Sequence, residues 1–520
     1  MTPKLTPASR AELLDELETT RFDIVVIGGG IAGAGIAREA AARGLRVALC
    51  EADDFGIGTS SRSSKLIHGG LRYLAQGRFD FVRRTARERN AVHAMAPHLA
   101  RPCWMVAPAR HWLQAQGFRC ALAVYERLGG VSRGDAHLSW DRAQLGQREP
   151  SIRLDAYGRA IAFREFLTDD VRLVLAVLRA AAASGAVLAT RTPVRNLLRQ
   201  GSVVSGVVVH CPLTGREVEV RASTVVNAAG PWVDRLALLE AEPPAAQVVV
   251  SKGVHLVVDR SRLPIEHPIL CVAPDRRWIF AVPRRDVVYI GTTETDHDGD
   301  RAVWPTVDRS DVDYLLTALN GYFTTSPLKP DDVQAAWAGL RTLPVRGVRK
   351  SIRMSREAEL RIGPGKLLSI SGGKLTGFAG LAADAVDLVG RLAGRELRPG
   401  PGVRPLPGAA SEPVVSDERL HQLYGADASD VVSLGAARLV EGAPVLTGEV
   451  DWAVDVEAAT TLEDVIYRRT LAAWFLPRHR SDLAEVIADR MAVLLGWSPH
   501  ARQAQVEAVQ LRFAAEVAFA

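Results

Sequence analysis

The stretch TSSRSSKLIHGGLRYL, Thr59 to Leu74, gathers hydroxyl groups, cations, a histidine and a glycine pair in one short segment. Such a composition is too polar for a core strand. Its serines and Lys65 can donate hydrogen bonds to an anionic or hydroxylated ligand. The stretch begins eight residues after a carboxylate, Glu51, which places it beside whatever that carboxylate binds. A solvated serine-rich turn is the alternative interpretation.

A glycine motif lies upstream, where DIVVI runs into GGGIAGAGIAREAAARG. The spacing of Gly28, Gly30 and Gly33 is that of the G-x-G-x-x-G turn, which places a pyrophosphate at a helix N-terminus. Gly28 allows the tight turn, Gly30 lets backbone amides approach the ligand, and Gly33 lets the helix sit close to the strand. Glu51 follows the next predicted strand, where an acid hydrogen-bonds a ribose hydroxyl. The motif indicates NAD or FAD; the alternative is a βαβ unit whose glycines serve packing alone.

Two later segments favour FAD over NAD. ASTVVNAAGPWVD (222–234) predicts a strand that ends in a turn of small residues, and KLLSISGGKLTGFAGLAADAVDLV (366–389) predicts a strand, a Gly-Gly turn and a helix. Gly372 and Gly373 give a second helix start at which backbone amides can meet an electronegative group. A long cofactor surrounded by several distant segments is typical of flavoproteins of the glutathione-reductase-like class.

The order of these motifs resembles that of the bacterial FAD-dependent glycerol-3-phosphate dehydrogenases of the respiratory, aerobic type, within the D-amino-acid-oxidase-like flavoproteins. The resemblance extends from residue 21 to residue 475. It is carried by IGGGIAGAGIAREAAARGL, SSKLIHGGLRYL, APHL, NAAGPWVD, SKGVHLVV, IGTTETDHDGD, WAGLRTL, SGGKLT and TLEDVIYRRT.

The resemblance implies a fold and a reaction. The expected fold is α/β, with a Rossmann-like FAD domain of the glutathione-reductase type, a mixed β-sheet substrate domain and a C-terminal all-α domain. The expected reaction oxidises sn-glycerol 3-phosphate to dihydroxyacetone phosphate, with hydride transfer to flavin N5 and electrons passed to a membrane quinone.

The resemblance also implies roles for residues around the substrate. A phosphate dianion binds guanidinium and ammonium groups, and Arg341, Arg72 and Lys374 are the candidates, with Tyr73 beside them. The hydroxyl proton needs a base, for which a neutral imidazole is suited near pH 7. His255 is the preferred base. His68, the other histidine in a family motif, is expected to touch the flavin. His255 as a hydrogen-bonded strand residue is the competing interpretation.

The cofactor is expected to contact a larger set of residues, and no metal site is expected. The set is Gly28, Gly30, Gly33, Glu51, Thr59, Ser60, Ser61, Ser64, Lys65, Ala229, Gly230, Gly372, Gly373 and Thr376.

The chain departs from the family pattern at two places. LTGFAGLAAD replaces the LTTYRKLAE of many members, so Ala379 stands where they have arginine. After Arg341, a basic segment replaces the usual acidic loop; it carries Arg346, Arg349, Lys350, Arg353 and Arg356. This loop either supplies phosphate contacts, binds a different anion, or is solvated. Three alternatives therefore stay open: an oxidase that uses O₂, a dehydrogenase for another hydroxy or amino acid, and a flavin-bound redox sensor or scaffold.

Hydrophobic periodicity and breakers predict the domain organisation. The FAD domain is expected at 21–80, 150–230 and 345–395, a helical segment that can face the membrane at 81–149, and the substrate domain at 231–344. The Pro- and Gly-rich residues 394–413 predict a linker, and 414–520 a helical domain.

Composition and partners complete the expectations. The net charge of +5 is small for 520 residues and suits an anionic ligand or an acidic membrane surface, without requiring nucleic acid. No secretory signal or membrane-spanning run is apparent, so the prediction is a cytoplasmic enzyme bound peripherally to the inner face of the membrane. The mixture of Trp, Phe, Leu and Arg at 101–128 suits an interfacial segment, although a helix covering the core is equally consistent. A homodimer is the possible assembly.

Overall fold

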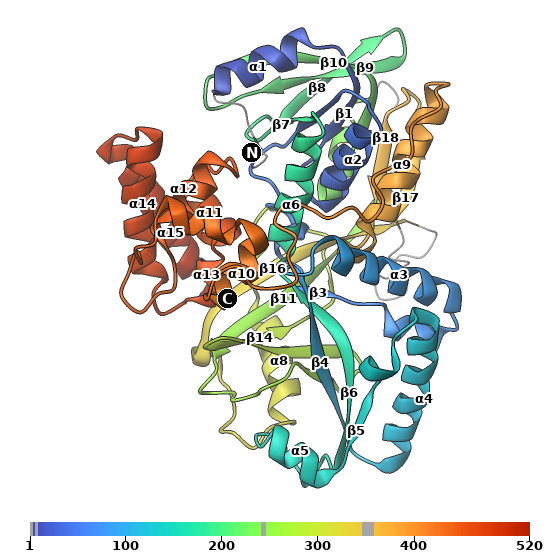
Figure 1. The fold of residues 1–520 in the computed structure, drawn as a ribbon, viewed down its shortest axis with the longest axis vertical. Coiled ribbons are helices and arrows are strands. Elements are labelled where there is room, and N and C mark those ends of the chain that lie inside the picture. Colours follow the sequence, from blue (N-terminus) through green and yellow to red (C-terminus); the bar gives the residue numbers. More distant parts are fainter. Residues whose placement is uncertain (1–3, 6–8, 241–245, 346–357, 520) are drawn as a thin grey trace.

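The computed structural model describes residues 4–5, 9–240, 246–345 and 358–519. Figure 1 shows an upper α/β part, a lower part around a second sheet, and a C-terminal group of helices on one side. The predicted α/β fold with a C-terminal helical domain is confirmed.

The upper part is built on an eight-stranded sheet within the described residues, in the order β17-β18-β10-β1-β2-β7, with β9 pairing β10 and β8. Its central strands run parallel. The strands are β1 Phe22–Ile27, β2 Val47–Cys50, β7 Val187–Ala189, β8 Val194–Gln200, β9 Val203–His210, β10 Glu217–Asn227, β17 Glu359–Ile362 and β18 Leu368–Ser371.

Helices cover both faces of this sheet. Ile24 and Val26 of β1 pack with α2 (Ile31–Ala42), α6 (Asp170–Ala183) and α9 (Phe378–Leu392). Val25 and Ile27 point to the other face, where α1 (Arg10–Thr19) lies. Strand β1, helix α2 and strand β2 form the βαβ unit that the glycine motif predicts.

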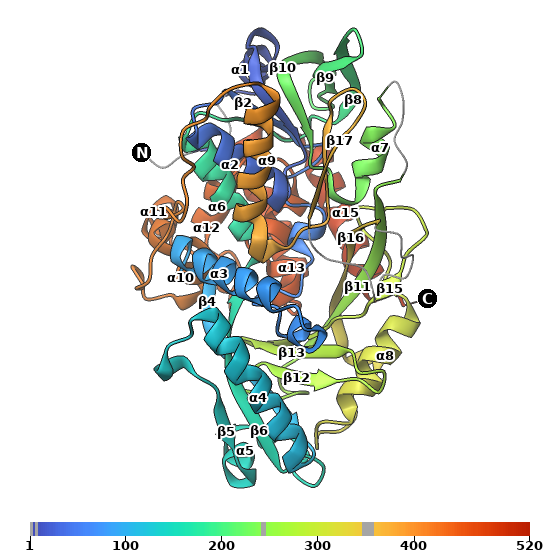
Figure 2. The same ribbon diagram turned by 90° about the vertical axis from the view of Figure 1, so that its right-hand side faces the viewer.

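The lower part contains a ten-stranded sheet within the described residues, in the order β15-β11-β14-β13-β12-β4-β6-β3, with β16 pairing β11 and β5 pairing β6. Its strands are β3 Leu66–Ile67, β4 Ala100–Ala109, β5 Leu138–Trp140, β6 Arg159–Thr168, β11 Val248–Asp259, β12 Ile269–Val272, β13 Trp278–Arg284, β14 Val287–Gly291, β15 Thr295–Asp296 and β16 Val333–Pro344. Helices α3 Phe79–Met95, α4 Trp112–Gly129, α5 Arg142–Arg148 and α8 Arg309–Asn320 accompany these strands, whereas the short helix α7 Val233–Ala237 lies against β10 and β18 of the upper sheet. Figure 2 shows α3 crossing between the upper and lower parts and α4 descending beside β6.

The prediction of a helical segment at 81–149 is wrong in part, because β4 and β5 lie within it. Strand β4 pairs along its whole length with β6, which the sequence assigned to the FAD domain. Pro102 and Pro108 weaken the strand signal of β4. The amide of Val106 donates to the carbonyl oxygen of Pro268, on the side of β4 that faces away from β6. Pro102 and Pro108 are an even number of residues from Val106, so their nitrogens face the same side. Neither proline therefore removes a hydrogen bond to β6.

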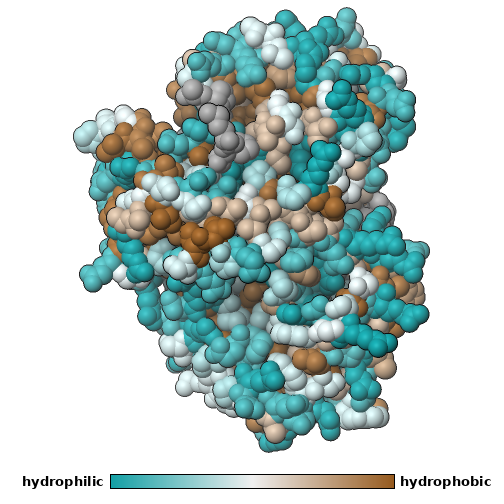
Figure 3. Space-filling view, viewed as in Figure 1, coloured by the Kyte–Doolittle hydropathy of each residue, from teal (hydrophilic) through white to brown (hydrophobic). Residues whose placement is uncertain are grey.

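The C-terminal helices begin after residues 393–417, which form neither helix nor strand. They are α10 Glu418–Tyr424, α11 Ala428–Leu434, α12 Thr447–Asp455, a π-helical turn Asp464–Arg469, α13 Ala472–Phe475, α14 Arg480–Leu495 and α15 Pro499–Val517. Their core includes Val257, Tyr289 and Trp337 of the lower sheet, so the helices pack on that sheet. In the face shown in Figure 3, hydrophobic residues gather on this helical part, while the surface of the lower sheet is mainly hydrophilic.

No helix in the described part of the chain combines the length and the hydropathy that a bilayer crossing requires.

Candidate functional site

A cavity of about 630 Å³ reaches from the βαβ unit of the upper sheet to strands β11 and β16 of the lower sheet. Most of the residues predicted from the sequence line it. They are Gly28, Gly30, Glu51, Thr59, Ser60, Ser64, His68, Tyr73, Ala229, Gly230, His255, Arg341, Gly372, Gly373, Lys374 and Thr376. Segments hundreds of residues apart in the sequence therefore meet at one cavity.

The upper end of the cavity is formed by the turn between β1 and α2. Gly28 has a φ of +105°, and a Cβ there would lie 2.7 Å from the Ala228 carbonyl oxygen. A Cβ on Gly33 would lie 1.9 Å from the Gly28 oxygen, so Gly33 serves close packing and does not line the cavity. At the start of α2, the amide of Ile31 donates to Ser60 Oγ over 3.0 Å. This cradle of backbone and hydroxyl groups fits an extended anionic cofactor.

Glu51 lies beside this turn at the end of β2. Its carboxylate accepts hydrogen bonds from the amides of Gly29, at 2.6 Å, and Asp53, at 3.0 Å. Burial, partly offset by the Gly29 hydrogen bond, raises the pKa of Glu51 to about 7. The two amides orient the carboxylate at the cavity wall, where it can still accept bonds from ligand hydroxyls.

The stretch from Thr59 onward connects the two sheets along the cavity. Thr59 Oγ1 donates to the Leu340 carbonyl of β16 over 2.5 Å. Ser64 Oγ lies 2.9 Å from Nε2 of His255 on β11. The short strand β3 then pairs with β6. The loop thus joins the glycine turn above to the imidazole below.

His255 is buried at the lower end of the cavity and stacks on Trp337, with ring centroids 4.9 Å apart and planes at 12°. Burial first, and then the charges of Arg341 and Lys65, lower the pKa of His255 well below its usual range. The imidazole is therefore neutral at pH 7. Its Nδ1 has no hydrogen-bond partner among the described residues.

Arg341 is held beside His255 by the strands themselves. Its guanidinium donates to the Thr293 carbonyl oxygen at 2.9 Å and to Thr292 Oγ1 at 2.5 Å. A Cβ on Gly253 would lie 2.3 Å from Arg341 NH2, and a Cβ on Gly291 would lie 2.1 Å from the His255 ring. Neither glycine was predicted from the sequence, although both lie in segments with a recognisable pattern, SKGVH and YIGTT.

Lys374 follows the Gly372–Gly373 turn and lines the same cavity. Its Nζ lies 4.3 Å from the centroid of Tyr73 and 4.6 Å from that of Phe81, which is within cation–π range. Tyr73 packs edge-on against Phe81, with centroids 4.7 Å apart. His68 also lines the cavity, and its Nδ1 accepts a bond from the Gly70 amide at 3.3 Å.

Besides Gly33, two residues of the predicted cofactor set, Lys65 and Ser61, do not line the cavity. Lys65 is fully buried away from the cavity, where its Nζ donates to Asp170 at 2.6 Å and to the Ser61 carbonyl at 2.9 Å. It also lies 5.0 Å from the Trp474 ring, in the C-terminal helices. Ser61 is buried as well, and its hydroxyl bonds back to Ile57 and Gly58. The side chain of Arg72 and the basic segment with Arg346, Arg349, Lys350, Arg353 and Arg356 lie outside the described residues.

Comparison with known proteins agrees with the fold and the cavity. The FAD dependent oxidoreductase family matches residues 23–359, and the C-terminal domain of alpha-glycerophosphate oxidase matches residues 381–502.

Individual relatives match as well. An aerobic glycerol-3-phosphate dehydrogenase of Staphylococcus haemolyticus is 37% identical over 76% of this chain and 71% of its own. Glycerol-3-phosphate dehydrogenase 2 of Mycobacterium tuberculosis is 35% identical over 99% of this chain and 92% of its own. The solved structure of the Bacillus halodurans glycerol-3-phosphate dehydrogenase complexed with FAD superposes with a TM-score of 0.82 and 30% identity, covering 99% of this chain and 98% of that one.

The fold and the cavity thus define an FAD-dependent oxidoreductase of the D-amino-acid-oxidase class. Within that class, the chain belongs to the FAD-dependent glycerol-3-phosphate dehydrogenase family. FAD is its cofactor, and the glycine cradle, Glu51 and the length of the cavity fit that group.

Proposed function

We propose that this enzyme oxidises sn-glycerol 3-phosphate to dihydroxyacetone phosphate and passes the electrons to a membrane quinone. One observation carries the proposal: His255, Arg341 and Lys374 line one cavity together with the glycine turn and Glu51. A neutral base and two cations in the same cavity as a nucleotide-type cradle suit a phosphorylated alcohol.

Each residue has a role in this proposal. Arg341 and Lys374 bind the phosphate dianion, and Tyr73 lines the same cavity. His255 takes the proton of the C2 hydroxyl as the C2 hydride leaves; when Nε2–H donates to Ser64 Oγ, the unpartnered Nδ1 is the basic atom. Bound FAD supplies the hydride acceptor, N5 of its flavin. His68, which also lines the cavity, contacts the flavin.

The cofactor is held by the remaining lining residues. The α2 N-terminus, with Gly28, Gly30 and Ser60, takes the pyrophosphate, and Glu51 takes the ribose hydroxyls. Further contacts come from Thr59, Ser64, Ala229, Gly230, Gly372, Gly373 and Thr376.

Anaerobic reduction of the bound flavin tests the proposed substrate. The oxidised flavin absorbance should bleach with sn-glycerol 3-phosphate and not with glycerol. A parallel screen of phosphorylated polyols, unphosphorylated polyols, hydroxy acids and amino acids covers the other substrates of the class. Bleaching by an amino or hydroxy acid, with none by glycerol 3-phosphate, would overturn the assignment.

An oxidase is the second candidate, because the C-terminal match is to a domain of alpha-glycerophosphate oxidase. Peroxide formed per substrate oxidised separates the two. A quinone reductase should give little peroxide in air and rapid turnover with a soluble quinone, whereas stoichiometric peroxide would establish the oxidase.

Glu51 gives a prediction for cofactor binding. Ribose hydroxyls donate to the ionised carboxylate, so the affinity of the cofactor-free chain for FAD should be full above pH 7 and fall as the pH drops through that value. Glu51→Gln should weaken FAD binding by about 10-fold at pH 8 and remove the pH dependence. Flavin fluorescence titration measures the affinity and its pH dependence. Glu219→Gln, near the start of β10, is the control. A wild-type affinity that is constant from pH 5.5 to 8 would contradict the role of Glu51.

Helix α4 is the proposed membrane contact, since quinone dissolves in the bilayer. Trp112 and Leu113 at its start are 56% and 71% exposed. Replacing both with serine should reduce binding to anionic lipid vesicles by about 100-fold, while turnover with a water-soluble quinone stays normal. Leu213→Ser, 52% exposed on the β9–β10 turn, is the control. Unchanged sedimentation with vesicles would remove α4 from the proposal.

A further inference from the structure

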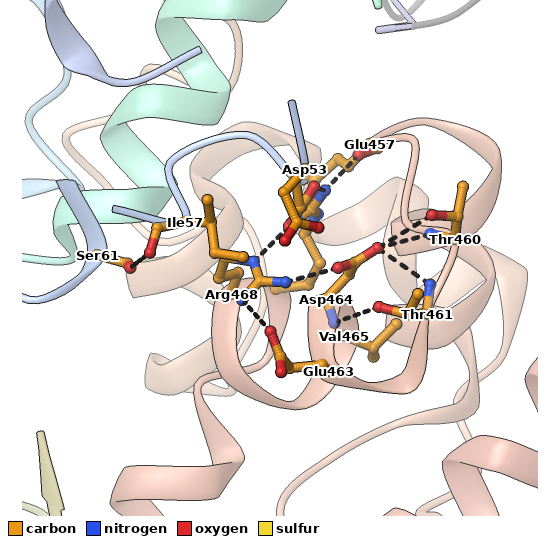
Figure 4. Close-up of polar contacts among 12 residues, drawn as sticks. Asp53, Ile57, Ser61, Glu457, Thr460, Thr461, Glu463, Asp464, Val465 and Arg468 are labelled. Atoms are coloured by element: carbon orange, nitrogen blue, oxygen red, sulfur yellow. Dashed lines mark hydrogen bonds and ion pairs between the residues drawn. The ribbon is translucent and has the colours of Figure 1, made fainter. Parts of the chain in front are cut away.

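The cofactor loop, defined here as residues 52–62, connects the upper sheet to the C-terminal helices. It follows Glu51 and carries Thr59 and Ser60, all three of which line the cavity. The other side of this loop reaches the π-helical turn Asp464–Arg469, because Asp54 of the loop is bonded to Arg468 and Arg469. Figure 4 shows this turn, with Arg468 bonded to Glu463 and Asp464.

Asp54 is the central contact of the loop. Its side chain is 1% exposed and accepts two bonds from Arg469, at 2.7 and 2.8 Å, in a bidentate pair. Arg468 Nε binds the same carboxylate. Arg468 continues to Glu463 at 3.1 Å and to Asp464 at 2.6 Å. Both arginines are fully buried, so the loop carboxylate completes a charge cluster that belongs to the C-terminal helices.

Two further contacts flank this cluster. Arg191, after β7, pairs with Asp53 and also donates to both oxygens of Asp464, at 2.8 and 3.0 Å. At the other end of the loop, the Arg62 guanidinium stacks 3.9 Å above the Trp304 ring. The loop is therefore fixed at its beginning and at its end by groups that reach the C-terminal helices.

Breaking one of these pairs would leave a buried charge without a partner, which is far more costly than losing an exposed ion pair. The loop conformation and the docking of the π-helical turn therefore depend on each other. Arg468 and Arg469 do not line the cavity. Any effect that they have on the cofactor is therefore indirect, and the shortest path runs through Asp54 and the backbone between Glu51 and Ser60.

We propose that Arg468 and Arg469 are positioning residues for FAD, and that docking of the C-terminal helices and FAD affinity are coupled through Asp54. By holding Asp54, the two arginines fix the cofactor loop in the conformation in which Glu51, Thr59 and Ser60 line the cavity. Because coupling of binding free energies is reciprocal, bound FAD also strengthens docking of the C-terminal helices. The inference rests on the proposed cofactor contacts of the loop and is independent of the substrate.

The first test measures the dissociation constant of FAD with the full chain by flavin fluorescence. Asp54→Asn and Arg469→Met should each weaken FAD binding by at least 10-fold. Arg179→Met is the matched control, because its pair with Asp427, at 2.7 Å, also joins α6 of the upper part to the C-terminal helices but involves neither the cofactor loop nor Arg469. The control should lower the melting temperature while its FAD affinity stays within about threefold of wild type. Equal weakening by the control, or none by Asp54→Asn, would overturn the proposal.

The second test compares the full chain with and without bound FAD and needs no severe substitution. FAD should slow proteolytic cleavage within residues 393–417, the connection to the C-terminal helices, in wild type. Arg468→Lys keeps the charge but loses the Nε bond to Asp54, and should reduce that protection. Equal protection in both proteins, or none in wild type, would overturn the coupling. Because neither test follows substrate oxidation, their failure is distinct from failure of the proposed reaction.

Discussion

Replacement of Arg341 by alanine is expected to raise KM for glycerol 3-phosphate by about 100-fold, as expected for loss of a buried charged hydrogen bond of a few kcal/mol. The guanidinium is held by Thr292 and Thr293, so it is ordered before the substrate arrives and pays little entropy on binding. FAD content should be unchanged, because Glu51 and the glycine turn lie at the other end of the cavity. Steady-state kinetics with a soluble quinone and the flavin absorbance ratio measure both quantities.

Two variants sharpen this prediction. Arg341→Lys keeps the charge but not the paired donors, and should fall between wild type and alanine. Arg262→Ala removes a surface arginine of the same part of the chain, paired with Asp332 at 2.8 Å, and should leave KM unchanged. A normal KM in Arg341→Ala would mean that the phosphate binds elsewhere.

The second large effect is expected at His255. His255→Asn should slow anaerobic flavin reduction by a factor of about 10² to 10⁴, the range for loss of a general base. Substrate affinity should change little, because asparagine retains a polar side chain in the same space beside Ser64. Stopped-flow reduction at saturating substrate isolates this step. His210→Asn, on β9, serves as the control, and normal reduction in His255→Asn would assign the base elsewhere.

The pH profile gives an independent check on His255. A general base must be unprotonated to accept the proton. The pKa of His255 lies well below the usual 6.5 because of burial and the nearby charges of Arg341 and Lys65. Flavin reduction at saturating substrate should therefore stay constant from pH 8 down to pH 6.5 and decline only at lower pH. This acid limb should be lost in His255→Asn. A limb centred above pH 6.5 in wild type would contradict the electrostatics described here.

Local signals predicted much of the fold. The strand, glycine turn, helix and acid of residues 22–51 follow each other in the sequence, and the structure has β1, α2 and β2 where the pattern indicated them. Sequence alone could not place Lys65, because its partner Asp170 and the ring of Trp474 lie far along the chain. Strand β4 was also not predicted. Its prolines are tolerated because their nitrogens face away from β6, the strand with which β4 pairs.

In the candidate site as well, local motifs predicted some features, and contacts between distant parts of the chain determined the others. Motifs identified which side chains carry chemistry, such as His255 and Arg341, since these types stand in recognisable segments. The motifs did not show that Gly253 and Gly291 leave space for the side chains of Arg341 and His255, because that space depends on which strands pair. The contacts of Arg468 with Asp54 also depend on docking between parts of the chain separated by about four hundred residues, which no local pattern encodes.

The pairing of β11 with β16 fixes the spacing between His255 and Arg341 at the lower end of the cavity. The ladder places His255 opposite Trp337 and Ser251 opposite Arg341, and the guanidinium reaches back to the level of Gly253, two residues from the imidazole. Two residues of strand span about 7 Å, and hydrogen bonds of the ladder prevent that span from stretching. Under the roles proposed for His255 and Arg341, an alcohol whose phosphate stood one carbon nearer or farther would therefore fit the pair less well.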